Sequence, residues 1–480
     1  MSLDFPSTFN NWEYVDPIDL YTAPTNKIEC NPKMRMNDFL SFEAKGVDYL
    51  VLWLDCDKEG ENICFEDVLI PIRFRFCSGA SATVIRIPGS VDGSPFQAYH
   101  AHHPSGSVDW YHRTLDFCVK VIDAVSEAMK RHVHGNFMQN VYRARFSAIT
   151  DKDIKLAMQN LVRPNRNESL SVDARQELDL RIGCSFTRFQ TKFFQNKYGD
   201  LDSTVISYGP CQTPTLGFCV SRHDQILHFK PESYWVLQCV FETSDGISIQ
   251  PSWKRERIFD RDVCQLFLER VKNAGIGIVI DRTTKESRKE RPIALNTVEL
   301  LRVASNAFGI SPSSTMSIAE NLYTQGFISY PRTETTSYSA NFDLIGTLNQ
   351  QTDSKWRDIV SKVLSHGIQK PRGGEDKGDH PPITPMKSDN GRLSGDMARI
   401  YDYIVQHFIA TLMGPCVFDV TTITISCGEE KFVLTSKCMK DPGFTEVMPW
   451  LVIEDDLKLP PLSHGDHVDL KYGPFAVINE

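Results

Sequence analysis

The sequence has no long apolar run, and this excludes one whole class of protein. No stretch approaches the ~18 consecutive apolar residues that a membrane-spanning helix needs. The start, Met1-Ser2-Leu3-Asp4, has no basic or apolar region typical of a secretory signal. The 13 cysteines include no Cys-x-x-Cys pair, so we expect neither a disulfide framework nor a four-cysteine zinc site. Scattered thiols favour a reducing compartment.

The sequence also lacks an excess of positive charge. It carries 52 basic and 61 acidic residues, a net charge of −9, which argues against a protein that coats nucleic acid over its whole surface. A local basic groove stays possible because phosphate contacts depend on local clustering. With 480 residues, 41% of them apolar and 24% charged, the chain has globular composition and a length typical of roughly three domains.

Three carboxylates follow an apolar segment near the start of the chain. Residues 49–54 (Tyr-Leu-Val-Leu-Trp-Leu) predict a strand buried in a parallel sheet, and an amphipathic pattern from Ile63 predicts a helix soon after it. Asp55, Asp57 and Glu59 lie between the two, at the sheet edge where α/β proteins bind ligands. Such crowded carboxylates suit Mg²⁺. The alternative is an acidic helix N-cap.

The rest of the chain alternates between helical and strand-like segments. Apolar residues at helical spacing predict a long helix over 172–194, with Arg175 and Asp179 together on another face. Residues 231–282 are strand-like, and 285–291 are predicted to be a charged connector. Helical periodicity returns from Pro292, with Gly326 as a helix stop, and strand-like sequence resumes after Cys416. This order predicts one domain inserted between two halves of another.

A tyrosine motif follows the predicted stop at Gly326. In Ile328-Ser329-Tyr330-Pro331-Arg332, a phenolic oxygen can attack a phosphodiester and hold it as a phosphotyrosine. Arg332 could bind phosphate oxygens through its planar fork. The alternative is a packed ring at the end of a strand.

Two further segments carry polar groups in rigid settings. His380 lies in a proline-bounded loop, where it could bind phosphate or move a proton, or could merely be exposed. The turn from Ser207 to Thr215 leads into a helix and could receive phosphates on its backbone N–H groups. It could equally be a helix cap.

Taken in this order, these segments resemble the type IA DNA topoisomerases, and within them topoisomerase III of the beta type. Residues 55–62 resemble the acidic motif of the Toprim domain, and 174–179 are similar to the family's Ala-Arg-x-x-x-Asp helix. The turn at 207–215 resembles the segment that contacts a single strand. Residues 328–334 resemble the active-tyrosine motif, and 379–383 the histidine loop.

The resemblance implies a padlock-shaped, multidomain protein of the α/β plus α plus β class. Its parts would be an α/β Toprim domain, a helical DNA-binding domain, a β-rich arch and an inserted helical domain carrying the tyrosine. The predicted boundaries are 1–155 for an incomplete Toprim domain with an atypical insertion at 67–120, 156–225 for a partial helical DNA-binding domain, 226–284 for the first half of the arch, 285–415 for the helical domain with the tyrosine, and 416–480 for the return half of the arch.

The resemblance implies an ATP-independent isomerase. Tyr330 would cleave one strand of single-stranded DNA, leaving a 5′-phosphotyrosine and a free 3′-hydroxyl that reseals the break after another strand has passed. This would relax negative supercoils and decatenate DNA, and the beta type adds RNA as a candidate substrate. Arg332 would stabilise the scissile phosphate, with His380 assisting. The implied Mg²⁺ ligands are Asp55, Asp57 and Glu59, with Glu59 also in proton transfer. The implied DNA-binding residues are Arg175, Asp179, Ser207, Tyr208, Gly209, Pro210, Cys211 and Gln212.

Three departures from the family lead us to expect at most weak relaxation activity. Family members begin with a strand carrying Glu-Lys-Pro, which supplies a catalytic glutamate and lysine, and we find no such strand here. Residues 67–120 have no recognised counterpart. The chain ends at Glu480, inside the expected second half of the arch.

Two alternatives from other classes stay open. Another Toprim enzyme, such as a primase or nuclease, would share the acidic motif without needing Tyr330. A catalytically impaired fragment would bind single strands with a steep salt dependence and leave no covalent adduct.

The resemblance implies a nuclear protein of DNA recombination and repair, with the cytoplasm as a second location. It also implies a Tudor-domain scaffold protein or a RecQ-type helicase as partner.

Overall fold

The chain folds into two compact units, each built from several separate segments. The computed structural model describes residues 2–28, 50–69, 141–198, 203–378, 380–454 and 459–479. Unit 1 comprises Met1–Asp224, Asn296–Thr335 and Asp376–Met386; unit 2 comprises Gln225–Leu295, Thr336–Glu375 and Lys387–Glu480. The domain boundaries expected from the sequence stay predictions, and most of the segment 67–120 lies outside the described residues.

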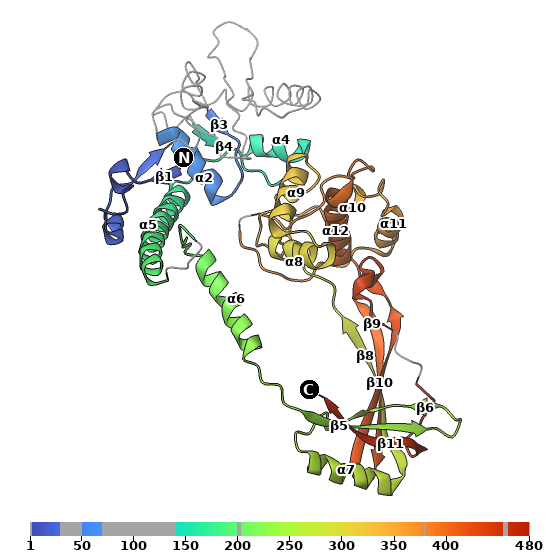
Figure 1. The fold of residues 1–480 in the computed structure, drawn as a ribbon. Helices are drawn as coiled ribbons and strands as arrows, with labels where there is room; N and C mark the ends of the chain where they lie inside the picture. The colour runs from blue at the N-terminus through green and yellow to red at the C-terminus, as the bar shows by residue number, and fades with distance from the viewer. Residues whose placement is uncertain are drawn as a thin grey trace. The chain divides into compact units, whose positions relative to one another are not determined.

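Unit 1 combines two small sheets with helices (Figure 1). Strand β3 (Leu50–Leu52) runs parallel to β4 (Val141–Arg143), and β1 (Ser2–Asp4) pairs antiparallel with β2 (Asn26–Ile28). The short 3₁₀ helices η1 (Ser7–Phe9) and η2 (Pro17–Tyr21) connect β1 to β2. Among the described residues, the α-helices of this unit are α2 (Lys58–Leu69), α4 (Asp151–Gln159), α5 (Arg166–Lys197), most of α6 (Gln212–Leu227), α8 (Thr297–Phe308) and α9 (Pro312–Thr324).

The predicted strand, turn and helix around the acidic motif are confirmed within the described residues. Val51, Leu52 and Leu54 are buried, as expected for an apolar strand covered on both faces. Val51 packs with Ala144 and with the apolar face of α4. The helix begins at Lys58, earlier than the amphipathic pattern from Ile63 suggested, because the Asp57 carboxylate accepts from the Gly60 N–H and caps the first turn.

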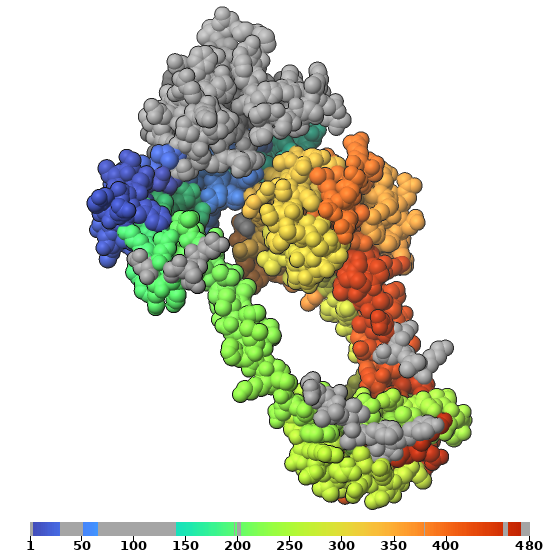
Figure 2. Space-filling view, viewed as in Figure 1, coloured from blue at the N-terminus to red at the C-terminus, as the bar shows by residue number. Residues whose placement is uncertain are grey.

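Helix α5 is the longest of the described elements, at 32 residues, and extends beyond the predicted range 172–194 at both ends. One side carries the N-terminal segment, where Phe5, Leu20 and Ala23 are buried against it. Much of the predicted apolar face is instead exposed, with Leu178 and Phe189 more than half accessible. Helix α6 likewise buries none of its residues in the described structure, and Figure 2 shows it as a green rod.

Unit 2 is organised around a seven-stranded sheet in the order β6-β5-β11-β8-β9-β10-β7, with every pair antiparallel. Its strands come from two distant parts of the chain. They are β5 (Tyr234–Glu242), β6 (Ser248–Ile249), β7 (Ser252–Trp253), β8 (Ile276–Lys289), β9 (Cys416–Cys427), β10 (Glu430–Asp441) and β11 (His467–Asn479).

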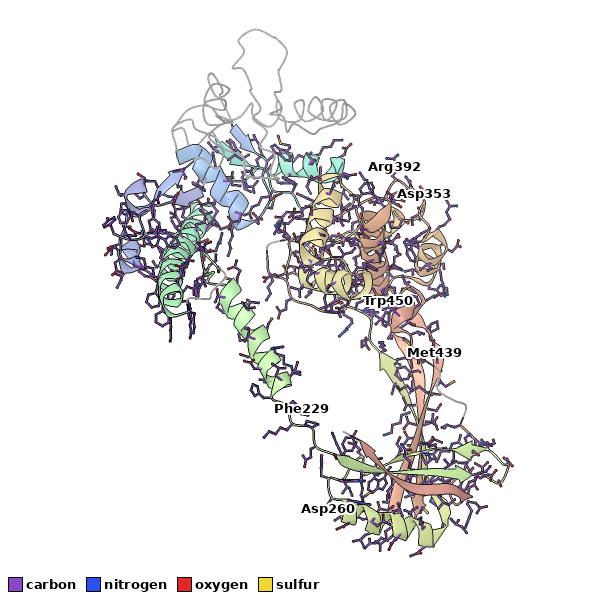
Figure 3. All side chains as sticks on the ribbon, in the orientation of Figure 1. Phe229, Asp260, Asp353, Arg392, Met439 and Trp450 are labelled. Atoms are coloured by element: carbon purple, nitrogen blue, oxygen red, sulfur yellow. The ribbon has the colours of Figure 1, made fainter. Side chains whose placement is uncertain are left out.

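One sequence expectation within this sheet is wrong, and another is incomplete. The segment 285–291 was expected to be a charged connector, but most of it belongs to a strand. Strand β8 continues through Lys289, which pairs with Cys416 of β9. Its charged side chains are tolerated because this part of the strand is largely solvent-exposed. The strand-like stretch 231–282 also contains helix α7 (Arg261–Ala274), capped by Asp260, which Figure 3 labels.

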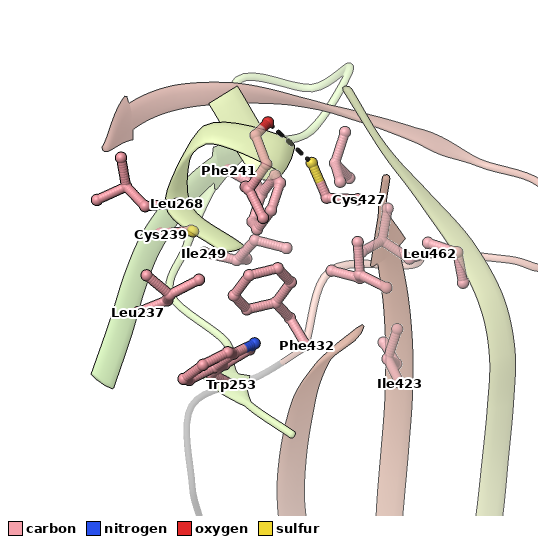
Figure 4. Close-up of a cluster of buried hydrophobic side chains, with 14 of the residues drawn as sticks. Leu237, Cys239, Phe241, Ile249, Trp253, Leu268, Ile423, Cys427, Phe432 and Leu462 are labelled. Atoms are coloured by element: carbon pink, nitrogen blue, oxygen red, sulfur yellow. Dashed lines mark hydrogen bonds between the residues drawn. The ribbon is translucent and has the colours of Figure 1, made fainter. Parts of the chain in front are cut away.

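One hydrophobic core of unit 2 lies between α7 and the sheet. Phe241, Phe432 and Trp253 are at its centre (Figure 4). The remaining helices of this unit are α10 (Leu344–Asn349), α11 (Arg357–His366), α12 (Gly395–Leu412), and the 3₁₀ turns η5 (Gly443–Glu446) and η6 (Pro449–Leu451). None of the described helices is long and apolar enough to cross a lipid bilayer.

Candidate active site

The tyrosine motif lies in a loop that its neighbours hold from both sides. The predicted helix stop is confirmed, since α9 ends just before Gly326, which has a φ of 73°. The loop then runs beside the histidine loop: Ser329 N donates to Thr384 O at 3.0 Å, and Met386 N donates to Phe327 O at 2.8 Å. This pairing fixes the backbone on both sides of the tyrosine.

The Tyr330 side chain reaches the acidic motif. Its backbone N donates to Ser147 O at 2.9 Å, which ties the loop to the segment after β4. Its ring is only 5% exposed, and its hydroxyl donates to Asp57 Oδ2 at 2.8 Å. Sequence segments 273 residues apart thus bring the candidate nucleophile and a candidate metal ligand into contact.

Two aromatic side chains surround Tyr330. The His380 ring lies 4.3 Å from it between centroids and is itself buried, while the Tyr323 ring makes an edge contact at 5.2 Å. Burial, together with the Asp57 and Asp55 carboxylates, raises the pKa of Tyr330 far above its ordinary value of 10.0, and the Arg332 guanidinium opposes this. The hydroxyl therefore stays protonated at neutral pH in this arrangement. The neighbouring Asp379 lies outside the described residues.

Asp57 takes the helix-capping role, one of the two roles that the sequence left open for the acidic motif. Its Oδ1 caps α2 by accepting from Gly60 N at 2.7 Å, while Oδ2 faces Tyr330. Burial, followed by the charge of Asp57, raises the pKa of Asp55 from 3.8 to about 6. A carboxyl whose charged form is disfavoured in this way is one that a hard divalent cation stabilises as the carboxylate. Asp55 and Asp57 therefore fit Mg²⁺, which binds through one or two carboxylates and keeps waters.

Glu59, the third expected metal ligand, has a different partner. Its Oε1 accepts from Arg175 Nη2 at 2.6 Å, and Arg175 Nη1 also contacts Asp179 Oδ2 at 2.9 Å. In the parts of the chain that the structure describes, no three His, Cys, Asp or Glu side chains gather closely enough to hold a metal. The expected three-carboxylate set is thus not assembled, because the Arg175 cation on α5 competes for Glu59.

Arg332 is paired with a residue that the sequence reasoning missed. Both its Nε, at 3.0 Å, and its Nη2 donate to Glu320 Oε1 on α9. Glu320 is also close enough to Asp55 to contribute to the raised pKa of that carboxyl. The sequence places Glu320 ten residues before Tyr330, on the preceding helix. A single glutamate on a helix is too common to indicate that it pairs with a particular arginine.

The candidate strand-binding turn packs on the same helix as Arg175. The Tyr208 ring stacks on Phe186 of α5 at 4.8 Å, and Tyr208 N donates to Thr187 Oγ1 at 2.9 Å. The turn ends where α6 begins, with Cys211 and Gln212 exposed. The remaining residues of this candidate set, Ser207, Gly209 and Pro210, lie in the same turn. Its contacts Phe186 and Thr187 lie along α5 little more than three helical turns beyond Arg175.

Comparison with known proteins assigns the family. The family described as DNA topoisomerase matches residues 163–473, well over half of the chain. The chain belongs to the DNA topoisomerase family. DNA topoisomerase 3-beta-1 of Homo sapiens is 50% identical over 469 residues, covering 97% of this chain and 48% of the human protein. DNA topoisomerase 3-beta of Drosophila melanogaster is 47% identical over 471 residues, covering 98% of this chain and 47% of the fly protein.

The fold of this topoisomerase family member also matches a solved structure. Full-length topoisomerase I from Thermotoga maritima aligns with a TM-score of 0.62 at 20% identity, over 100% of this chain and 66% of that one. The expected type IA fold and the resemblance to beta-type topoisomerase III are confirmed. The family assignment removes the alternative of a primase or nuclease. The chain spans about half the length of the curated relatives it matches.

Proposed function

We propose that this chain cleaves and reseals single strands of DNA through a covalent bond to Tyr330. The observation that carries the proposal is the contact between the Tyr330 hydroxyl and Asp57, with His380 against the same ring. A tyrosine that only filled the core would not require a hydrogen bond to a carboxylate that follows β3. Here the hydroxyl is the one polar atom of the ring, and it faces the carboxylates.

The cleavage reaction exchanges one phosphodiester for another. Tyr330 Oη forms a bond to phosphorus as the bond to the 3′-oxygen breaks, leaving a 5′-phosphotyrosine and a 3′-hydroxyl. The phenol loses one proton and the 3′-oxygen gains one, so the step is neutral overall and needs no external energy source. Resealing is the same reaction in reverse, with the 3′-hydroxyl as nucleophile.

Positive charge is needed because the transferring phosphoryl group is anionic. We assign Arg332 to the scissile phosphate, which would replace or share the Glu320 carboxylate as partner of the guanidinium. His380, packed against Tyr330, is assigned an assisting role beside the same phosphate. Asp55 and Asp57 would hold Mg²⁺, with Glu59 able to join them if it leaves Arg175. The bound ion would supply charge stabilisation during resealing.

The strand would approach along α5. Arg175 and Asp179 lie next to the acidic motif, and the turn from Ser207 to Gln212 continues the path further along the helix. Exposed N–H groups and side chains in such a turn bind the backbone of a single strand rather than its base sequence.

The decisive experiment traps the covalent intermediate. The chain is incubated with Mg²⁺ and a single-stranded DNA oligonucleotide labelled at one end, and denatured. We expect an adduct that carries a 3′-end label and not a 5′-end label, because the break leaves the downstream strand on the protein. Tyr330→Phe should abolish the adduct. Tyr323→Phe is the matched control, since it removes the hydroxyl of the adjacent buried tyrosine and should leave the adduct in place.

The same experiment separates the binding-only alternative. Single-strand binding with a steep salt dependence, and no adduct with either label, would mean that this chain binds without cutting. An undiminished adduct in Tyr330→Phe would remove Tyr330 from the mechanism. An RNA oligonucleotide of the same sequence, labelled in the same way, tests the RNA activity that we propose alongside DNA cleavage.

For the cell we propose relaxation of negative supercoils and decatenation of DNA in recombination and repair. The proposed location is the nucleus, with the cytoplasm second, and the proposed partners are a Tudor-domain scaffold or a RecQ-type helicase. These proposals rest on the resemblance to beta-type topoisomerase III. Imaging of the tagged protein and plasmid relaxation assays test them directly.

A further inference from the structure

A buried arginine lies directly beneath the acidic motif. Arg143, the last residue of β4, is 0% exposed. Its Nη1 donates to Leu54 O at 2.7 Å and to Ala144 O at 3.2 Å, and its Nη2 donates to Asp55 O. Strand β3 has already ended at Leu52, so the guanidinium takes the place of a strand neighbour for the carbonyls of Leu54 and Asp55.

The arginine has an equally buried partner. Nε of Arg143 donates at 3.1 Å to Glu61 Oε1 in the first turn of α2, and Glu61 is 1% exposed. The second carboxylate oxygen of Glu61 accepts from Asn165 N at 2.9 Å, and Asn165 caps α5. A buried ion pair is tolerated only when its remaining donors and acceptors are satisfied, and this pair is extensively hydrogen-bonded.

The pair connects the elements that carry the candidate site. It joins the end of β3, which leads into Asp55 and Asp57, to α2 and to α5, which carries Arg175. The space is tight, since a Cβ added at Gly60 would lie 3.1 Å from Arg143 Nη2. A shift of the guanidinium would therefore move the loop that presents Asp57 to Tyr330.

We propose that Arg143, held by Glu61, is a positioning residue that sets the acidic motif for Mg²⁺ and for Tyr330. The proposal rests on the roles that the proposed function gives to Asp55, Asp57 and Tyr330. Neither Arg143 nor Glu61 touches a reacting atom. Arginine is required because its planar fork reaches several acceptors at once, which a lysine ammonium cannot match at the same positions.

The test compares Arg143→Lys and Glu61→Gln with a control of equal burial. Glu430 in unit 2 is also 1% exposed and accepts from Trp253 Nε1 and Arg255, so Glu430→Gln disturbs a buried carboxylate of the unit that does not contain the acidic motif. Two measurements need no reaction: hydrogen exchange of the amides of residues 55–61, and titration with Mn²⁺ as a spectroscopic substitute for Mg²⁺. A third measures, before denaturation, resealing of the covalent adduct against Mg²⁺ concentration.

We expect Arg143→Lys to speed exchange at residues 55–61 and to raise the metal concentration for half-saturation about 10- to 100-fold, the usual effect of losing a partner behind a metal ligand. The oligonucleotide concentration for half-maximal adduct should stay unchanged. Glu430→Gln should lower the melting temperature and leave all three measurements at wild-type values. If Arg143→Lys does not fold, Glu61→Gln is measured in its place, since it keeps an acceptor for Arg143 Nε.

Wild-type exchange and Mn²⁺ affinity in a folded Arg143→Lys or Glu61→Gln protein would overturn the proposal and leave the pair a structural role only. Failure of the wild-type chain to form any adduct would count against the proposed function instead. In that case, the exchange and Mn²⁺ measurements still decide whether Arg143 positions the motif.

Discussion

The hydroxyl of Tyr330 donates to the carboxylate of Asp57 across a separation of 273 residues. Asp57 can meet it only because its other oxygen fixes the first turn of α2, where Gly60 lets the chain turn closely over Asp55. The geometry of the tyrosine site thus depends on the tight backbone turn that carries the acidic motif.

Gly60→Ala should disturb this turn. A Cβ at this position would lie 1.9 Å from Asp55 O, so the backbone must shift, at a cost of about 2–3 kcal/mol in the free energy of unfolding. Adduct formation should fall with it, because Asp55 and Asp57 move. Urea unfolding and the trapping assay measure the two effects.

Gly217→Ala provides the comparison for that substitution. This glycine lies in α6, where an added Cβ meets no atom within 4 Å, so the change should be neutral or stabilise by up to about 1 kcal/mol. Equal losses of stability in the two variants would show that the turn at Gly60 is not the constraint described here.

Glu320→Gln should lower the concentration of single-stranded oligonucleotide that is needed to form the adduct. Glu320 holds the Arg332 guanidinium, and a phosphate must compete with it. Since the pair is about half exposed, its loss should change stability by less than about 1 kcal/mol. The oligonucleotide concentration for half-maximal adduct should fall about 3- to 10-fold, because removing the competing carboxylate strengthens the phosphate contact.

Glu299→Gln is the matched control for Glu320→Gln. It removes the same charge from an exposed Arg–Glu pair on the neighbouring helix α8. The two variants have the same net charge, so an equal gain in both would mean that overall charge, rather than the release of Arg332, sets the affinity.

Features of this site that depend on residues close together in the sequence could be predicted, and features that depend on distant residues could not. The apolar run before Asp55, the stop at Gly326 and the cap at Asp57 are local patterns, and the structure bears out the strand, the helix end and the turn. Beta pairing is non-local, so the continuation of β8 through Lys289 could not be recognised from its charged residues.

The residues that contact the candidate site residues could not be predicted from the sequence either. Glu61 was part of the recognised acidic motif, yet its contact with Arg143, 82 residues away, depends on how β4 pairs with β3. The same holds for Arg175, whose contact with Glu59 spans 116 residues and removes that carboxylate from the expected metal set. Motif spacing identifies residue types but not the competing contacts that the fold gives them.

Arg175→Ala should weaken the binding of single-stranded DNA while changing the free energy of unfolding only slightly. The side chain is about half exposed, so losing its pairs with Glu59 and Asp179 should cost less than about 1 kcal/mol. If Arg175 contacts a phosphate, the salt dependence of single-strand binding should weaken by about 0.7 in the log–log slope, the release of one counterion. Filter binding at several salt concentrations measures this slope.

Arg181→Ala on the same helix should behave in the opposite way. Arg181 Nη1 donates to the carbonyls of Leu20 and Ala23, which attaches the N-terminal segment to α5. Its loss should lower the melting temperature and leave the salt slope intact. An unchanged slope in Arg175→Ala as well would remove Arg175 from the strand path.

The stability of unit 2 should fall in alkaline solution because thiols buried in its core ionise more readily in the unfolded chain. Burial, with the charge of Cys427 adding to it, raises the pKa of Cys239 from 9.0 to about 12, and burial raises the pKa of Cys427 to about 11. Figure 4 shows both in the core, with the Cys427 thiol donating to Val271 O. Between pH 9 and 11 the unfolded chain releases these protons while the folded chain keeps them, so the unfolded state gains.

The contribution of each thiol is therefore complete below about pH 9 and is lost as the pH rises, on the order of 1.4 kcal/mol per pH unit. Urea unfolding of unit 2 at pH 8, 9 and 10 measures the effect. Cys239→Ala should reduce the loss between pH 9 and 10, since one of the buried titrating thiols is gone, while Cys427 and Cys264, whose pKa burial also raises, keep the rest. Cys438→Ala removes an exposed thiol of the same unit and should leave the pH dependence as in the wild type. The same alkaline loss in Cys239→Ala as in the wild type would mean that other groups, and not this buried thiol, set the response.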